Sequence, residues 1–147
     1  MGTVVDLQDC FTDINVHREA KSAIGRTSDV IAELNVEQLE AGFTSEGKRL
    51  RKYRNRNYAM FKNAINPLPG FGNPDLILTG SFTKSFQIDV GSDDIEVVSD
   101  DIHNLAERYG EDIFGLSDDN QEFYNEEIFF PEFAESIEGI TGLKIQQ

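Results

Sequence analysis

The sequence predicts a single α+β domain over residues 1–147, in which a long N-terminal helix packs on a small antiparallel β-sheet and further helices follow. Two patterns carry this prediction. Apolar residues recur at three- and four-residue steps across residues 14–40, as in an amphipathic helix. Apolar and polar residues alternate across residues 86–98, as in strands that bury one face. A chain of this length can bury roughly two thirds of its unfolded surface in one core.

The predicted helix over residues 14–40 is the longest of the chain. Gly25 lies inside it and is expected to cost about 1 kcal/mol relative to alanine, and to mark a break or a close contact. Asn35 or Gly42 is expected to end the helix, and a second short helix is expected to begin at Asn35. Its apolar stripe is Val16, Ala20, Ala23 or Ile24, Thr27, Val30 or Ile31, and Leu34.

The alternation over residues 86–98 predicts a β-hairpin whose loop, residues 91–94, is polar and begins with a glycine. Upstream, Thr79 is expected to cap a short helical turn over residues 80–85. A two-stranded ribbon is marginally stable alone, so flanking segments are expected to cover its apolar face. The apolar members of the alternation are Phe86, Ile88, Val90, Ile95 and Val97.

Helix signals continue after the hairpin. Residues 99–101 provide caps for a helix over residues 102–109, and Gly110 is a natural left-handed stop. Further helices are expected from Ser117 to about Glu127, and from Pro131 to Gly139 or Gly142. The aromatic and aliphatic residues of this last region either close the core or dock on a neighbouring subunit. They are Phe129, Phe130, Phe133, Ile137 and Ile140.

The formal net charge of −14 is unevenly distributed along the chain. Residues 1–87 carry 11 Lys or Arg and 10 Asp or Glu, whereas residues 88–147 carry 2 Lys or Arg and 17 Asp or Glu. Such asymmetry predicts a dipolar molecule with a basic centre and an acidic second half. The acidic flank of one copy is therefore suited to the basic flank of an identical neighbour.

The basic residues concentrate in residues 48–56, where six of nine positions are Lys or Arg and Tyr53 interrupts the charges. One interpretation is a phosphate-contacting patch, because cations displace DNA counterions and Tyr53 and Tyr58 can stack on bases. The other is pairing with carboxylates of this chain or of a neighbouring copy, which 27 acidic residues favour. The candidate subunit-interface or DNA-contact residues are Lys48, Arg49, Arg51, Lys52, Arg54 and Arg56.

A short helix is predicted after this segment, ending before Pro67 because proline disfavours helical backbone at the preceding residue. Residues 67–74 contain three prolines and two glycines, which predicts a turn-rich surface loop. The apolar face of the short helix is expected to be Tyr58, Phe61, Ala64 and Ile65.

No catalytic, metal or cofactor site is predicted. The Asp pairs at residues 93–94, 100–101 and 118–119 read as turn and helix-start residues, and none has the ligand spacing of a calcium loop. His17 and His103 lack zinc spacing, and Ser85 with His103 lacks a nucleophile elbow. The single cysteine, Cys10, forms no internal disulfide. No apolar run approaches the roughly 18 residues that a membrane span needs.

Three groups of residues carry a resemblance to a known family, over about residues 35–125. Leu78-Thr79-Gly80 is followed by Phe82, Phe86 and the predicted hairpin. The upstream group is Gly47-Lys48-Arg49, Tyr53, Tyr58-Ala59 and Lys62, and the downstream group is Leu105, Arg108-Tyr109-Gly110 and Ile113-Phe114-Gly115-Leu116. In this order and spacing they resemble the neck and tail-completion proteins of tailed bacteriophages.

The resemblance implies a virion structural protein rather than an enzyme, assembled in the host cytoplasm and located at the head–tail junction. Its partners would be identical copies in a ring around the DNA channel, with virion proteins on the portal side and on the tail side. Residues 48–56 of one subunit would then meet the acidic second half of the next in a heterologous interface. Two alternatives are a nucleic-acid-binding accessory protein that uses residues 48–56, and an acidic DNA mimic that inhibits a host enzyme.

Overall fold

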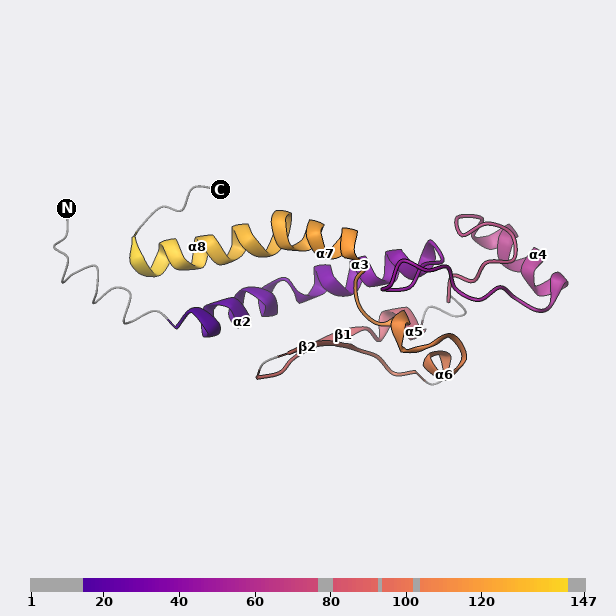
Figure 1. Cartoon of the computed structure of the whole chain (residues 1–147), viewed down its shortest axis with the longest axis horizontal. Coiled ribbons are helices and arrows are strands. Elements are labelled where there is room, and N and C mark those ends of the chain that lie inside the picture. Colours follow the sequence, from indigo (N-terminus) through magenta and orange to yellow (C-terminus); the bar gives the residue numbers. More distant parts are fainter. Residues whose placement is uncertain (1–14, 77–80, 93, 102–103, 143–147) are drawn as a thin grey trace.

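The computed structural model describes residues 15–76, 81–92, 94–101 and 104–142. It is an elongated, mainly helical molecule with one two-stranded antiparallel sheet, which confirms the predicted α+β class. Two helices from the N-terminal part run along its length, and the C-terminal helices lie beside them (Figure 1). A separate helix, α4, lies at the far end of the long axis, and the hairpin lies below the N-terminal helices in this view.

The predicted long helix consists of two helices, α2 (Val16–Arg26) and α3 (Ser28–Glu40). The break lies at Thr27, two residues after Gly25, and the Thr27 hydroxyl donates to the carbonyl of Ala23 at 2.9 Å. Helix α3 ends just before Gly42, whose φ of +89° suits a glycine. The expectation that a second helix begins at Asn35 is wrong, because Asn35 lies fully buried inside α3.

The predicted hairpin is confirmed as β1 (Gln87–Val90) paired with β2 (Ile95–Val98). Val90 faces Ile95 across the turn, so both apolar sets share one side of the ribbon. Helices α2 and α3 contact β1 and cover that side, as expected for a marginal ribbon. The helix α5 (Ser81–Lys84) leads into β1, whereas the Thr79 cap lies outside the described residues.

The core forms where segments distant in sequence converge beneath α3. The Phe82 and Phe86 rings contact each other edge to face at 5.1 Å, and Phe86 meets Phe114 at 5.9 Å. Phe82 and Phe86, which belong to the residues that carry the resemblance, are therefore buried in the core rather than exposed. The buried hydrophobic cluster consists of Leu39, Leu50, Leu76, Phe82, Phe86, Leu105 and Ile113.

The segment after the hairpin begins with α6 (Leu105–Tyr109) and the single 3-10 turn η1 (Glu111–Ile113). The Asp101 carboxylate accepts hydrogen bonds from the backbone N–H groups of Leu105 at 2.7 Å and Ala106 at 2.8 Å. It thereby satisfies orphan donors at the helix start, as the acid-rich sequence predicts. Gly110, with φ +106°, ends α6 as expected.

The last two predicted helices are one continuous helix in three parts: α7 (Asp118–Phe123), the π-helical turn η2 (Tyr124–Phe129) and α8 (Phe130–Thr141). Ser117 caps its start, as predicted. The expected interruption before Pro131 is wrong. Proline lacks an N–H and its ring disturbs the regular pattern four residues back, and the wider π turn accommodates both effects without a break.

Helix α8 lies along α2 and closes that side of the molecule. Arg26 pairs with Glu132 at 2.5 Å, and the Thr27 and Tyr124 hydroxyls hydrogen-bond at 2.7 Å. The rings of Phe129 and Phe133 stack at 5.6 Å. The aromatic tail thus mainly closes the fold, although Phe130 and Ile140 stay exposed.

Two buried amides of α3 hold the chain between η1 and α7. Asn35 donates to the carbonyl of Ile113 at 3.0 Å and accepts from the N–H of Gly115 at 2.9 Å. One turn further, Gln38 accepts from the N–H of Ser117 at 2.7 Å and donates to the Gly115 carbonyl at 3.2 Å. We call this pair of side chains the amide clamp. It satisfies backbone groups of a segment that pairs with no strand among the described residues.

The buried ion pair between Lys62 and Asp75 attaches α4 (Arg56–Ile65) to the core. Their side chains are 7% and 2% exposed, and Lys62 Nζ lies 2.8 Å from Asp75 Oδ1. Asn66 donates to the other Asp75 oxygen at 3.0 Å and to the carbonyl of Glu40 at 3.3 Å. This network ties the end of α4 to the end of α3.

Replacing Asn35 with alanine will destabilise the fold, because the Ile113 carbonyl and the Gly115 N–H lose their buried partner. We expect a loss of about 1–3 kcal/mol for each of these groups in urea-induced unfolding. The control is Asn57→Ala, at an exposed position of α4, which should change the free energy of unfolding by less than about 0.5 kcal/mol. Equal effects of the two variants would contradict the amide clamp.

Replacing Asp75 with alanine removes the carboxylate that pairs with the buried Lys62 ammonium. We expect this to lower the free energy of unfolding by about 3–5 kcal/mol, measured by chemical denaturation. The double variant Lys62→Met with Asp75→Leu removes both charges and should lose clearly less. If the double variant is less stable than Asp75→Ala, the ion pair itself supplies net stability, and the loss in Asp75→Ala does not come from a buried charge without its carboxylate.

Candidate functional site

The residues that could carry catalysis are occupied by structural hydrogen bonds or lie outside the described ranges. The Ser85 hydroxyl donates to the Phe82 carbonyl at 2.7 Å and accepts from the Asp100 N–H at 3.0 Å. His17 contacts the Ser92 carbonyl at 2.8 Å, while His103 and Cys10 are not described. Among the described residues, no three His, Cys, Asp or Glu side chains group to hold a metal ion.

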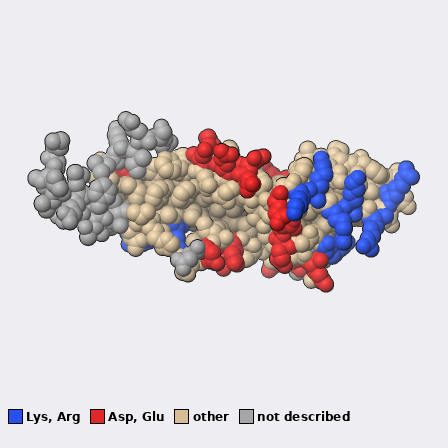
Figure 2. All heavy atoms as spheres, viewed as in Figure 1, with Lys and Arg blue, Asp and Glu red and all other residues tan. Residues whose placement is uncertain are grey.

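The most distinctive surface is the basic lobe, which we define as residues 48–73. It contains seven Lys or Arg and no Asp or Glu. In the space-filling view most of the Lys and Arg side chains lie at the α4 end of the molecule, with most of the Asp and Glu over its middle (Figure 2). Arg18, Lys21 and Arg26 on α2 are basic residues away from this end. The charge asymmetry of the sequence is therefore in part a separation along the long axis.

The structure divides the six predicted basic residues into two groups. Lys48 forms an ion pair with Glu46, Arg49 lies over the Phe43 ring at 4.8 Å, and Arg51 donates to the Arg108 carbonyl at 3.0 Å. These three side chains are engaged within the chain. The other three are exposed, and within the described ranges their side chains make no ion pair or hydrogen bond. They are Lys52, Arg54 and Arg56.

The two tyrosines predicted to interleave with these cations pack against each other. The rings of Tyr53 and Tyr58 meet edge to face at 5.0 Å, and both residues are half-buried. Burial, assisted by the negative charge of Asp75, raises the pKa of Tyr53 well above its ordinary value. The Tyr53 phenol is neutral at physiological pH, as it would be at its ordinary pKa, so the charge of the lobe comes from its cations.

Helix α4 exposes the side that the sequence predicts to be buried. Phe61 is 59% exposed and Ile65 is 63% exposed, while the buried residues of the helix are Ala59 and Lys62. The prediction is wrong because the helix turns its face towards the buried Asp75 carboxylate instead of towards an apolar layer. The lobe consequently presents an apolar patch beside its cations. The patch is Met60, Phe61, Ile65, Leu68 and Phe71.

The loop after α4 is held in place by its own hydrogen bonds. The N–H of Gly70 donates to the Pro67 carbonyl at 3.0 Å, and the Asn73 side chain donates to the Pro69 carbonyl at 2.8 Å. Pro69 and Pro74 are buried, so the loop is only partly the surface segment that was predicted. A loop with so many internal bonds presents its exposed side chains in a defined arrangement.

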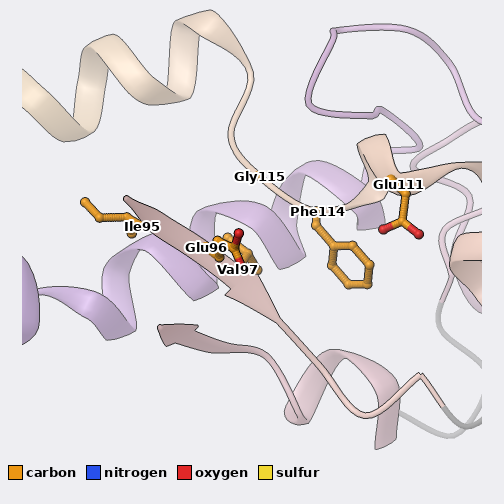
Figure 3. Close-up of a pocket in the computed structure, with 6 residues that line it drawn as sticks. All are labelled: Ile95, Glu96, Val97, Glu111, Phe114 and Gly115. Atoms are coloured by element: carbon orange, nitrogen blue, oxygen red, sulfur yellow. The ribbon is translucent and has the colours of Figure 1, made fainter. Parts of the chain in front are cut away.

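A groove runs beside the outer edge of β2, between this strand and the segment held by the amide clamp (Figure 3). Its volume is about 370 Å³, and its exposed lining is about as polar as it is apolar, because two glutamates stand beside the apolar side chains. Within the described ranges, no third strand pairs with the hairpin, so β2 borders the groove as a sheet edge. The lining residues are Ile95, Glu96, Val97, Glu111, Phe114 and Gly115.

Sequence reasoning did not predict the groove or the apolar patch. The groove joins residues 95–97 to residues 111–115, which only the folded chain brings together. A signal for the patch was present, because the apolar residues of α4 outnumber those that a short amphipathic helix can bury. Exposed apolar side chains of this kind are common at surfaces that contact other macromolecules.

Among the helices of the described ranges, none combines the length and the apolarity required to cross a membrane. Comparison with protein-family models, with curated protein sequences and with solved structures finds no match for this chain.

Proposed function

We propose that this chain is a ring-forming structural subunit of the neck or tail-completion region of a tailed bacteriophage. The observation that carries the proposal is the separation of the basic lobe from an acid-rich surface on one elongated chain. A molecule with two complementary surfaces at different places associates head to tail. Such a heterologous contact closes into a ring when the rotation between neighbours fits.

The charges available for this contact are exposed cations on the basic lobe and exposed carboxylates on the second half of the chain. Lys52, Arg54 and Arg56 are exposed and meet no carboxylate within the described ranges. The second half supplies exposed carboxylates on several elements, among them Glu96 on β2 and Glu111 on η1. Opposite charges of this kind steer association and set the register of the partners more than they add affinity.

The phage setting rests on the resemblance carried by residues 35–125, and the mechanism proposed is assembly rather than catalysis. In a ring around a DNA channel, acidic residues that face the lumen would repel phosphates and let the genome slide rather than adhere. The cations would be covered by subunit contacts. Portal-side and tail-side proteins would bind the two faces of the ring.

Reversing two exposed lobe charges tests the assembly. We expect Arg54→Glu with Arg56→Glu to abolish rings in sedimentation and negative-stain electron microscopy, with an unchanged circular dichroism spectrum, because like charges then face each other. The matched control is Arg18→Glu with Lys84→Glu, which changes the net charge equally at exposed sites outside the lobe. Rings that form unimpaired from the lobe variant would overturn the interface.

Immunogold electron microscopy of purified particles tests the location. Gold at the junction of head and tail is the expected result. Absence of the protein from particles, determined by mass spectrometry, would overturn the structural role.

A nucleic-acid-binding role is the second candidate, and the exposed Lys52, Arg54 and Arg56 favour it. It requires that the purified monomer binds DNA with an affinity that falls steeply as salt rises. The Arg54→Glu and Arg56→Glu variant would then lose DNA binding while any self-association persists.

A further inference from the structure

We infer that the exposed turn containing Leu68 and Phe71 in one copy inserts into the groove beside β2 of a second copy. This inference rests on the proposed self-association and names the two surfaces that meet. One surface is an apolar projection surrounded by cations. The other is a hollow whose lining combines apolar side chains with two carboxylates.

The projection is exposed and held in a fixed conformation. Leu68 is 69% exposed and Phe71 is 54% exposed, in a turn whose two glycines have positive φ, Gly70 at +90° and Gly72 at +81°. The N–H of Asn73 also donates to the Gly70 carbonyl at 3.1 Å. A preorganised aromatic side chain loses little conformational entropy on binding, which makes it an effective anchor.

The groove has the size and lining to receive such an anchor. Its volume of about 370 Å³ falls within the ~300–1,000 Å³ range of binding pockets. Val97 and Phe114 form part of its wall and also pack on the hydrophobic core, so that wall is supported from behind. The amide clamp also holds Gly115, next to Phe114 on the side of the groove that faces β2 (Figure 3).

The charges beside the two surfaces are opposite. The N–H of Tyr53 donates to the Gly72 carbonyl at 2.9 Å, which places Lys52 and Arg54 next to the Phe71 turn. Glu96 and Glu111 line the groove and are exposed. Since residues 48–73 contain no acid, every charge that the projection brings to the groove is attractive.

The occupant must come from another copy, because the lobe and the groove lie at different places along the molecule. In Figure 1 the α4 lobe ends the long axis, whereas β2 extends beneath α2 and α3. The contact therefore joins unlike surfaces of two chains, and it can repeat from copy to copy. A closed ring requires such a repeating contact between unlike surfaces.

Removal of the anchor tests the contact directly. We expect Phe71→Ser to weaken self-association at least tenfold in sedimentation equilibrium, since a buried aromatic anchor carries much of an interface's affinity. The matched control is Phe123→Ser, at a phenylalanine of α7 that is 47% exposed, and it should leave self-association unchanged. Leu68→Ser is a second anchor variant, and the circular dichroism spectrum must be native for each.

The groove side is tested by charge exchange and by crosslinking. Glu96→Arg with Glu111→Arg should weaken association, and adding Lys52→Glu with Arg54→Glu to the same chain should restore it. In a Cys10→Ser background, Phe71→Cys on one copy and Glu96→Cys on another should form an intermolecular disulfide. The control pair, Phe123→Cys with Glu96→Cys, should not.

The outcomes separate this inference from the proposed function. A wild-type protein that stays monomeric at every concentration overturns both. Rings that persist in Phe71→Ser, with no crosslink to Glu96→Cys, overturn the anchor contact and leave the assembly role standing. Loss of association in Phe71→Ser and Phe123→Ser alike would also contradict the anchor, because the effect would then be general.

Discussion

The amide clamp of α3 is the constraint on which the rest of the architecture depends. A helix can support a passing chain only if the polar backbone groups of that chain find partners, and Asn35 and Gln38 provide them for residues 113–117. The clamp thereby holds Ile113 in the core and places Ser117 where it caps α7. The position of the C-terminal helix along α2 follows from that starting point.

Both proposed contact surfaces are held in place by buried polar interactions. The α4 lobe is attached by the Lys62–Asp75 ion pair, and one wall of the groove is attached by the amide clamp. Hydrogen bonds and ion pairs are directional, so they fix an element in one orientation more strictly than apolar packing does. A rigid support of this kind lets apolar side chains remain on the surface, available for a partner, without collapse onto the chain's own core.

Local periodicity predicted where the helices and strands lie better than it predicted what surrounds them. The hairpin was predictable because alternation at period two sets which residues of 86–98 share a face, whatever covers them. Asn35 was misinterpreted as a helix end because asparagine commonly occurs there, whereas its actual partners lie 78 and 80 residues away. The face of α4 was also misassigned, since an amphipathic pattern does not reveal that the buried partner is a carboxylate.

Residue patterns alone predicted the fold class, the hairpin, several helix ends and a basic segment in an acidic chain. These follow from backbone geometry and from charge counts, which are local properties. The exposed cations and the groove beside β2 could be identified only in the folded chain. Those features arise where residues far apart in the sequence meet, because burial and hydrogen-bond satisfaction are set by the whole folded chain.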